Sequence, residues 1–272
     1  MALFSKLFGG RHDAPAQTGA PLGRAQFADH YVRMLARLAP EIAAERVDGD
    51  VRLRWPDGGT MTQFLGNAYT QFLVNPGDLD ALLAAQLASA RATAQVEGLD
   101  LARVMPLIKS RAWLATATEQ AGDRADFVLR PLIADLIVVY AQDLPDTISY
   151  VRGTDLDGVC DEAQLTARAL ANLSERVPAL QIVGGEGRYR IELDGFFDAS
   201  LILVAAEWLD DIAIEGDPVF AIPTRDQLMV CGAADPDAVA GLAEIAQRIT
   251  QSDAYDISGR LLTLRNGALQ AI

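Results

Sequence analysis

Apolar residues recur at helical spacing along several stretches of the chain. In residues 24–38 (RAQFADHYVRMLARL), Phe27, Tyr31, Met34, Leu35 and Leu38 fall on one face, which predicts an amphipathic helix. The same periodicity, bounded by capping residues and by glycine or proline stops, predicts further helices. Their expected ranges are 60–74, about 79–95, about 158–176, 198–212 with Asp198 as a candidate N-cap, and 235–249.

Between these helices, β-branched and aromatic residues gather in short runs that are bounded by turn residues, and such runs predict strands. Asp48-Gly49 and Asn266-Gly267 each separate two short runs, as the tight turns of β-hairpins do. A third hairpin is expected over 180–193, around Gly184-Gly185. The remaining extended segments are expected over 102–118, 134–144, 146–151 and 218–233, the last of them divided by residues 223–226.

The order of the elements indicates an α+β fold with two topologically similar units, each an antiparallel sheet packed with helices. Residues 1–23 are expected to form a flexible tail, 24–153 the first α+β unit and 154–272 the second. Each unit runs through helix, hairpin, Asp-Gly, helix and strands, which favours an internal duplication.

A short pattern supports this duplication. Residues 108–114 read IKSRAWL and residues 222–228 read IPTRDQL, so both follow Ile-x-(Ser/Thr)-Arg-x-x-Leu. We interpret the pattern as framework: the isoleucine (Ile108 or Ile222) enters the core and the hydroxyl residue (Ser110 or Thr224) tightens a bend. The arginine (Arg111 or Arg225) is then expected to reach a carboxylate, and the leucine (Leu114 or Leu228) to re-enter the core on the next strand.

The composition is that of a globular protein rather than a disordered one. Among 272 residues, 50% are hydrophobic and 22% are charged. The formal net charge of −14 repels phosphate backbones, and no basic cluster offsets it, so nucleic acid is not an expected partner. The two cysteines, Cys160 and Cys231, are too few for a disulfide framework, which favours the reducing cytoplasm. With His12 and His30 as the only histidines, no metal site based on imidazole is expected.

The first residues, MALFSKLFGG, do not form a secretory signal, because Lys6 and the two glycines interrupt the apolar run. No stretch of the chain has the roughly 18 continuous apolar residues of a transmembrane helix. On a helix, Leu3, Phe4, Leu7 and Phe8 would share one face. A contact of residues 1–10 with a membrane surface or a partner is therefore the alternative to a simple flexible tail.

Four segments carry a resemblance to a known family. They are RVMPLIKS (103–110), RPLIADLIVVYAQDLPDTISYV (130–151), FFDASLIL (196–203) and FAIPTRDQLMV (220–230). In order and spacing they resemble the YtpQ-like bacterial family of unknown function, over residues 24 to 272. The chain departs from that family in its N-terminal tail and its alanine-rich composition. The resemblance implies a soluble, cytoplasmic α+β protein, and it supplies no reaction, cofactor or catalytic residue.

Candidate chemistry centres on a few charged residues. Arg225 and Asp226 follow Pro223 at a turn, where Arg225 could hold an anion and Asp226 could act as a base or a metal ligand. In the alternative they make local turn contacts: the arginine pairs with a nearby carboxylate and the aspartate caps backbone N–H groups. We favour the turn contacts, since Ala112 follows Arg111 and the acid is not repeated. Asp194 and Asp198 complete the set of weak candidates for a catalytic role.

Other motifs point to structural roles. The acidic run TDLDGVCDE (154–162) has its glycine and its last glutamate too early for a calcium loop, and capping of the next helix accounts for it. Cys160 and Cys231 have no histidine partner suited to a nucleophilic thiol and are expected to act as small apolar residues. No fingerprint of a phosphate-binding loop or of a serine hydrolase is present, so no cofactor and no metal is expected.

The sequence therefore favours a non-enzymatic function, namely a protein-binding, adaptor or chaperone-like module. The order of its elements is similar to that of small secretion-chaperone-like folds, which is an analogy of fold alone. The alternative is an enzyme that uses Arg225, Asp226, Asp194 and Asp198 in a cleft between the two units. The sequence does not fix an oligomeric state.

Overall fold

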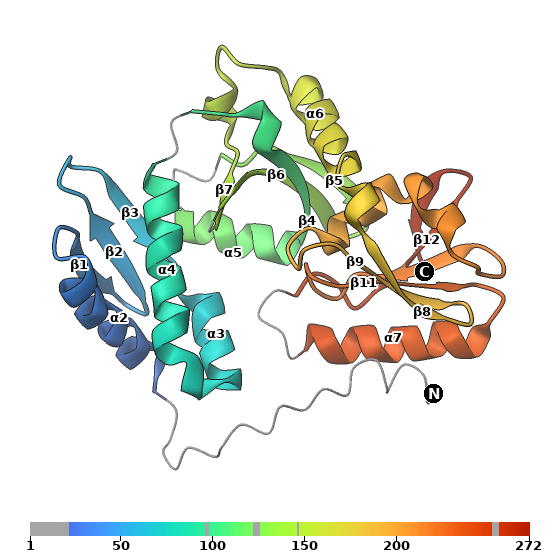
Figure 1. Cartoon of the computed structure of the whole chain (residues 1–272), viewed down its shortest axis with the longest axis horizontal. Helices are drawn as coiled ribbons and strands as arrows, with labels where there is room; N and C mark the ends of the chain where they lie inside the picture. Colours follow the sequence, from blue (N-terminus) through green and yellow to red (C-terminus); the bar gives the residue numbers. More distant parts are fainter. Residues whose placement is uncertain (1–21, 96–97, 122–125, 146, 252–255) are drawn as a thin grey trace. The chain divides into compact units, whose positions relative to one another are not determined.

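The computed structural model describes residues 22–95, 98–121, 126–145, 147–251 and 256–272, and it confirms the α+β class. The chain forms two compact units (Figure 1). The large unit contains Glu97–Asp143 and Ser149–Ile272, and the small unit contains Arg11–Val96 and Leu144–Ile148. The expected division at 153/154 therefore falls inside the large unit. The expected tail lies outside the described residues up to residue 21.

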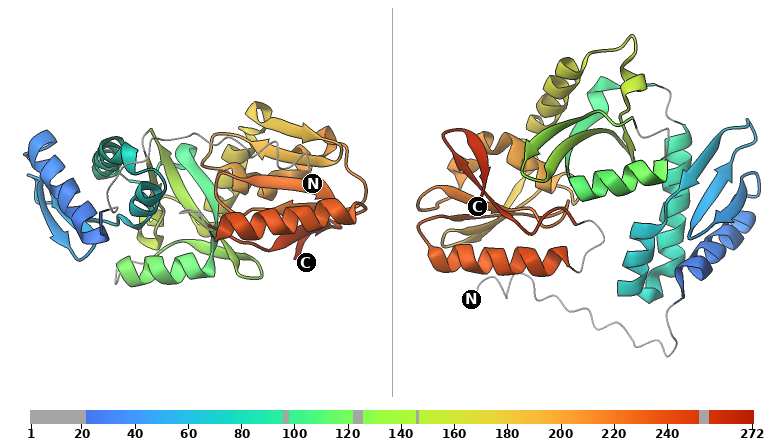
Figure 2. Two further views of the ribbon diagram at one scale, coloured as in Figure 1. Left: turned by 90° about the horizontal axis from the view of Figure 1, so that it is seen from below. Right: turned by 180° about the vertical axis from the view of Figure 1, so that it is seen from behind.

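The small unit is a three-stranded antiparallel sheet packed with helices. Its strand order is β1-β2-β3, and α2 contacts β1 and β2 (Figure 2). The Asp48-Gly49 turn between β1 and β2 is as predicted, and Asp48 has a positive φ of 56°. The elements are α2 (Arg24–Leu38), β1 (Ala43–Val47), β2 (Asp50–Arg54), β3 (Thr60–Gln63), α3 (Gly66–Val74), η1 (Pro76–Asp78) and α4 (Leu79–Ala94).

Aromatic rings fill the core of the small unit. Phe27 lies 5.6 Å from Tyr69 and 5.3 Å from Phe72, measured between ring centroids. The hydroxyl of Tyr31 donates to Oε1 of Gln63 over 2.8 Å, and this pair is buried. The prediction that α2 buries one face is confirmed, because Phe27, Tyr31 and Leu35 are all fully buried. Leu38, which was expected on the same face, is 55% exposed.

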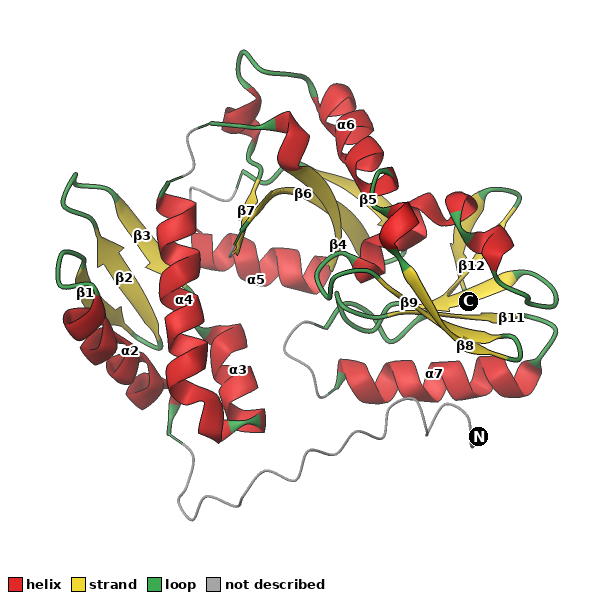
Figure 3. Ribbon diagram, in the orientation of Figure 1, coloured by secondary structure: helices red, strands yellow, loops and turns green. Residues whose placement is uncertain are grey.

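The large unit contains most of a four-stranded antiparallel sheet with helices on it, while Leu144, Thr147 and Ile148 of this sheet belong to the small unit. The strands are β4 (Val104–Ser110), β5 (Leu129–Ile133), β6 (Leu136–Leu144) and β7 (Thr147–Tyr150), with β6 between β4 and β5 and with β7 paired to β6. Alternate residues of β4 and β6, among them Val104, Val138 and Tyr140, share a core with Leu165 and Ala169 of α6 (Glu162–Ser174). Helix α5 (Arg111–Ala121) follows directly after β4 (Figure 3).

A six-stranded antiparallel sheet forms the rest of the large unit, in the order β13-β12-β10-β11-β9-β8. Helix α7 (Pro236–Thr250) covers β10 and β11, and its Leu242 and Ala246 share a core with Met229 and Cys231. The strands are β8 (Gln181–Gly185), β9 (Arg188–Glu192), β10 (Pro218–Ala221), β11 (Leu228–Gly232), β12 (Leu261–Arg265) and β13 (Ala268–Ala271). Two 3-10 helices, η6 (Asp198–Glu207) and η7 (Leu209–Asp211), lie between β9 and β10. The other described 3-10 helices of the large unit are η2 (Leu101–Arg103) before β4, η4 (Gly153–Leu156) after β7 and η5 (Val177–Ala179) before β8.

Four local predictions were wrong. The segment 102–118 is a strand only to Ser110, where the Ser110 hydroxyl oxygen accepts a hydrogen bond from the N–H of Trp113 over 3.0 Å and begins α5. Residues 60–63 pair with β2 instead of starting a helix. The hairpin of 180–193 turns at Glu186-Gly187, two residues later than expected. The segment 198–212 forms 3-10 helices, and η6 has a kink at Val204.

The two compact units differ from the expected repeats of 24–153 and 154–272, so the internal duplication stays a prediction. Among the described residues, no helix is both long and apolar enough to cross a membrane.

Candidate functional site

The four candidate residues lie on two adjacent loops of the large unit. Strand β11 pairs with β9 so that Leu228, its first residue, is opposite Ile191, near the end of β9. The loop after β9 (the first loop) and the loop before β11 (the second loop) therefore meet at one end of the sheet. The N–H of Ala199 donates to the carbonyl of Arg225 over 3.0 Å and joins them. All four candidates lie within the large unit, whereas the enzyme alternative placed them in a cleft between two units.

Asp198 and Asp194 hold the first loop in shape. The carboxylate of Asp198 is 2% exposed and accepts from the N–H groups of Leu193, Asp194 and Gly195 over 3.0, 3.2 and 2.7 Å. Asp198 is the first residue of η6, so the N-cap position that was expected for Asp198 is occupied by Phe197. Burial raises the pKa of Asp198, and the three N–H donors oppose that rise. A carboxylate with these contacts serves the turn rather than a substrate.

The side chain of Asp194 also holds the first loop through hydrogen bonds to its backbone. Its Oδ1 atom accepts from the N–H groups of Phe196 and Phe197 over 2.8 and 2.9 Å. Its Oδ2 atom pairs with Nη1 of Arg176 over 3.0 Å. Arg176 also pairs with Asp143 of β6, and its guanidinium carbon lies 5.2 Å from the ring centroid of Phe197. Arg176 therefore ties the first loop to the four-stranded sheet.

The second loop holds an aromatic side chain of the first loop. The guanidinium carbon of Arg225 lies 4.3 Å from the ring centroid of Phe196, which is a close cation–π contact. Phe196 is 43% exposed and follows Gly195, whose φ of 76° is readily adopted only by glycine. Asp226 is exposed and its Oδ1 atom accepts from the Thr224 hydroxyl over 2.6 Å. Asp226 therefore makes a local turn contact with a side-chain hydroxyl, where a cap on backbone N–H groups was expected, and Arg225 contacts an aromatic ring, where a carboxylate was expected.

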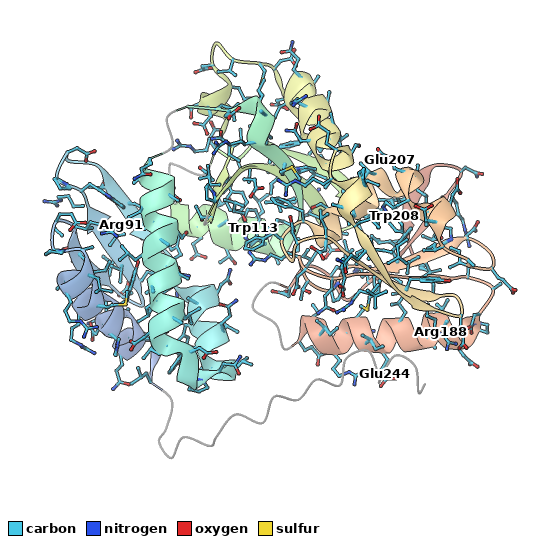
Figure 4. The ribbon with its side chains drawn as sticks, viewed as in Figure 1. Arg91, Trp113, Arg188, Glu207, Trp208 and Glu244 are labelled. Carbon is cyan, nitrogen blue, oxygen red and sulfur yellow. The ribbon has the colours of Figure 1, made fainter. Side chains whose placement is uncertain are left out.

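Lys109 was missed by the sequence reasoning, although it is the buried cation of this region. It lies on β4 opposite Ile137, and its side chain is on the face of the sheet away from α6. The residue is 7% exposed, and its Nζ atom lies 5.3 Å from the ring centroid of Trp113. Trp113, which Figure 4 labels, belongs to α5. Burial lowers the pKa of Lys109 to about 8, the charge of Arg225 lowers it too, and Asp256 opposes this. A strongly shifted pKa near other charges marks a candidate functional residue.

Trp113 belongs to a cluster of half-buried aromatic rings. Its ring centroid lies 5.7 Å from that of Phe127 and 5.2 Å from that of Tyr150, and those two rings are 5.7 Å apart. Packing against two rings fixes the indole that lies beside Lys109, which restricts where the amine can point.

The repeated arginine pattern has different outcomes in its two copies. In the second copy Ile222, Thr224 and Leu228 are fully buried, and Leu228 begins β11 as predicted. In the first copy Ile108 is buried as predicted, but Arg111 begins α5 and Leu114 lies half-buried on that helix. The prediction that Leu114 re-enters the core on a strand is wrong, because the chain turns into a helix at Ser110.

The remaining candidates have structural contacts. In the acidic run, Asp161 caps α6 by accepting from the N–H of Gln164 over 2.7 Å, as predicted. Cys231 is buried, which raises its pKa to about 11, whereas Cys160 is half-buried. His30 is half-exposed on α2, with Nε2 3.5 Å from Oδ1 of Asp80. Among the described residues no group of three or more His, Cys, Asp or Glu side chains is arranged to hold a metal ion.

Comparisons with family models, with curated proteins and with solved structures found no match for this chain. The resemblance to the YtpQ-like family therefore stays a prediction. The site has to be interpreted from its own geometry.

Proposed function

We propose that the large unit is a protein-binding module that contacts its partner through Phe196. The observation that carries the proposal is an exposed phenylalanine held under a guanidinium group on two hydrogen-bonded loops. Aromatic residues and arginine are enriched at protein interfaces, where a few such residues supply most of the binding energy.

The surroundings of Phe196 support this role. Five hydrogen bonds from backbone N–H groups to Asp194 and Asp198 fix the loop, so little conformational entropy would be lost when a partner binds. Arg225 then acts as a positioning residue for the ring, whereas its pattern predicted a carboxylate as the partner of the guanidinium. A side chain that is rigid and apolar but 43% exposed gains from being covered by a partner.

The alternative of an enzyme built on the four candidate residues has less support. The oxygens of Asp194 and Asp198 are occupied by backbone N–H groups and by Arg176, and Asp226 is bonded to Thr224. We keep as proposals an adaptor or chaperone-like role, a cytoplasmic location and membership of the YtpQ-like family. A partner protein, rather than nucleic acid, also agrees with the net charge of −14.

Affinity capture from cell lysate tests the proposal. The full-length parent, Phe196→Ser and the matched control Val159→Ser are immobilised; Val159 is also exposed, at 47%, but lies away from both loops in sequence. We expect one or more proteins to be retained by the parent and by Val159→Ser, and reduced at least about tenfold by Phe196→Ser. Equal retention by all three proteins, with folding checked by circular dichroism, would refute the role of Phe196.

A further inference from the structure

One surface of helix α3, in the small unit, is apolar and uncharged. Leu73 and Val74 in its last turn are 46% and 66% exposed, and they lie one turn after Tyr69 and Thr70. The Thr70 hydroxyl donates to a backbone carbonyl of the helix over 3.1 Å, so its polar atom already has a partner. Residues 58–77 contain no charged residue, although 22% of the chain is charged. We call these four side chains the α3 surface, and their exposure and lack of charge indicate that it makes a contact.

The described chain begins beside the α3 surface. The hydroxyl of Tyr69 donates to the carbonyl of Leu22, the first described residue, over 3.0 Å. The side chain of Leu22 packs against the core of the small unit, and Arg24 pairs with Asp50 over 3.0 Å. These contacts fix the point at which residues 1–21 join the small unit, and that point lies next to a member of the α3 surface.

The sequence before Leu22 contains a segment whose chemistry suits this surface. In residues 3–8 (LFSKLF), two leucines and two phenylalanines would share one face of a helix, and Lys6 is the only charged residue among the first ten. The last turn of α3 has no basic residue, and the exposed Asp78 follows it, so a cation is favoured nearby. The apolar face and the charge of residues 3–8 therefore complement the α3 surface and its surroundings.

The intervening chain is long enough for such a contact. Residues 9–21 number thirteen (21 − 8), and a chain of that length rich in glycine and alanine spans about 20 Å on average. The nine residues of α3 extend over about 14 Å. A short link gives an effective concentration of about 1 mM, so a contact with a dissociation constant of about 1 mM is formed about half of the time. Between separate molecules at micromolar concentration the same contact would be almost absent.

We propose that the apolar face of residues 3–8 binds the α3 surface of the same molecule. Residues 3–8 then compete with any other apolar ligand of α3, and such a ligand has to displace them. This contact belongs to the small unit, so it is independent of the protein-binding role proposed for Phe196 in the large unit.

The reactivity of a thiol introduced into the α3 surface tests the contact. Val74→Cys is made in the full-length chain together with Cys160→Ser, since Cys160 is half-buried and Cys231 is fully buried, and alkylation by N-ethylmaleimide is followed by mass spectrometry. A second protein also has the four apolar residues of the segment changed to serine, which keeps the net charge: Leu3, Phe4, Leu7 and Phe8. We expect the introduced thiol to react at least about twofold more slowly with the natural segment, because half occupancy halves its exposure. Equal rates in the two proteins would overturn the proposal.

Two controls identify what covers the thiol. Val159→Cys, made in the same two backgrounds, places a thiol at a 47% exposed position of the large unit and should react at the same rate in both. An equal slowing at this position would reveal a general effect of the serine substitutions and would count against the contact. The slowing at Val74→Cys should be the same at about 2 µM and about 50 µM protein, because an intramolecular contact does not depend on concentration. Slowing that appears only at the higher concentration would assign the segment to a second molecule and refute the intramolecular contact.

Discussion

Replacing Lys109 by methionine removes the amine while it keeps a long unbranched side chain in β4. In the folded protein the pKa of Lys109 is about 8, against an ordinary value of 10.5. Each pKa unit corresponds to about 1.4 kcal/mol, so burial of the charged amine costs about 3 kcal/mol of folding free energy near neutral pH. Lys109 is only 7% exposed, so screening by solvent reduces this figure little.

The sign of the pH dependence follows from proton binding. Because the pKa is lowered on folding, the unfolded chain binds this proton more tightly than the folded protein does. The stability of the parent therefore rises between pH 8 and 10.5, and it is lost as the pH falls through about 8. Between pH 7 and pH 10 we expect the parent to gain about 2.5 kcal/mol relative to Lys109→Met.

Urea unfolding at pH 7 and at pH 10 measures this difference. Trp55 lies in the small unit, whereas Trp113 and the fully buried Trp208 lie in the large unit, so a Trp55→Phe background makes fluorescence report on the large unit. Lys109→Arg is the control, because a guanidinium keeps its charge at pH 10 and should gain nothing. A difference between parent and Lys109→Met that stays constant within about 0.5 kcal/mol would refute the desolvation argument.

Two further predictions concern stability in the two units. Asp198→Ala leaves three backbone N–H groups without their acceptor, although water can reach the N–H of the exposed Gly195. We expect the free energy of unfolding of the large unit in urea to fall by about 2–3 kcal/mol. An unchanged unfolding midpoint would contradict the three hydrogen bonds. Leu35→Asp places an unpaired charge in the core of the small unit and should cost several kcal/mol; a melting temperature within a degree of the parent would show that α2 is not docked there.

The elements that the sequence predicts best are those fixed by local chemistry. Asp48-Gly49 and Asn266-Gly267 mark their hairpins because Asp48 and Asn266 adopt positive φ angles of 56° and 51°, as this kind of turn requires. Helix α7 was predicted from its apolar spacing, and its N-cap Asp235 accepts from the N–H of Ala238 over 2.9 Å. In these cases the decisive contacts lie within a few residues.

The errors have a physical cause as well. After Ser110 the residues Arg-Ala-Trp-Leu-Ala-Thr have mixed helix and strand propensities, and the cap made by the Ser110 hydroxyl favours the helix. The pairing of Phe196 with Arg225 depends on the placing of β11 between β9 and β10, which is a long-range choice. Lys109 could have been noticed from the sequence, because it is one of only two lysines and follows the apolar run VMPLI, which is expected to form a buried strand. Its neighbours Trp113, Arg225 and Asp256 could not have been assigned without the fold.

The division of the small unit into Arg11–Val96 and Leu144–Ile148 has a consequence for the order of events on the ribosome. The hydroxyl of Ser89 donates to that of Thr147 over 2.7 Å. A nascent chain that has been synthesised only as far as residue 96 therefore still lacks part of this unit. At about 5–20 residues per second, translation of the intervening residues 97–143 takes roughly 2–10 seconds. During that interval β4, β5 and most of β6 of the large unit emerge. A chain that ends at residue 96 would therefore lack residues 144–148 of the small unit. The small unit is completed only after most of the first sheet of the large unit has been synthesised, although each unit has a core of its own.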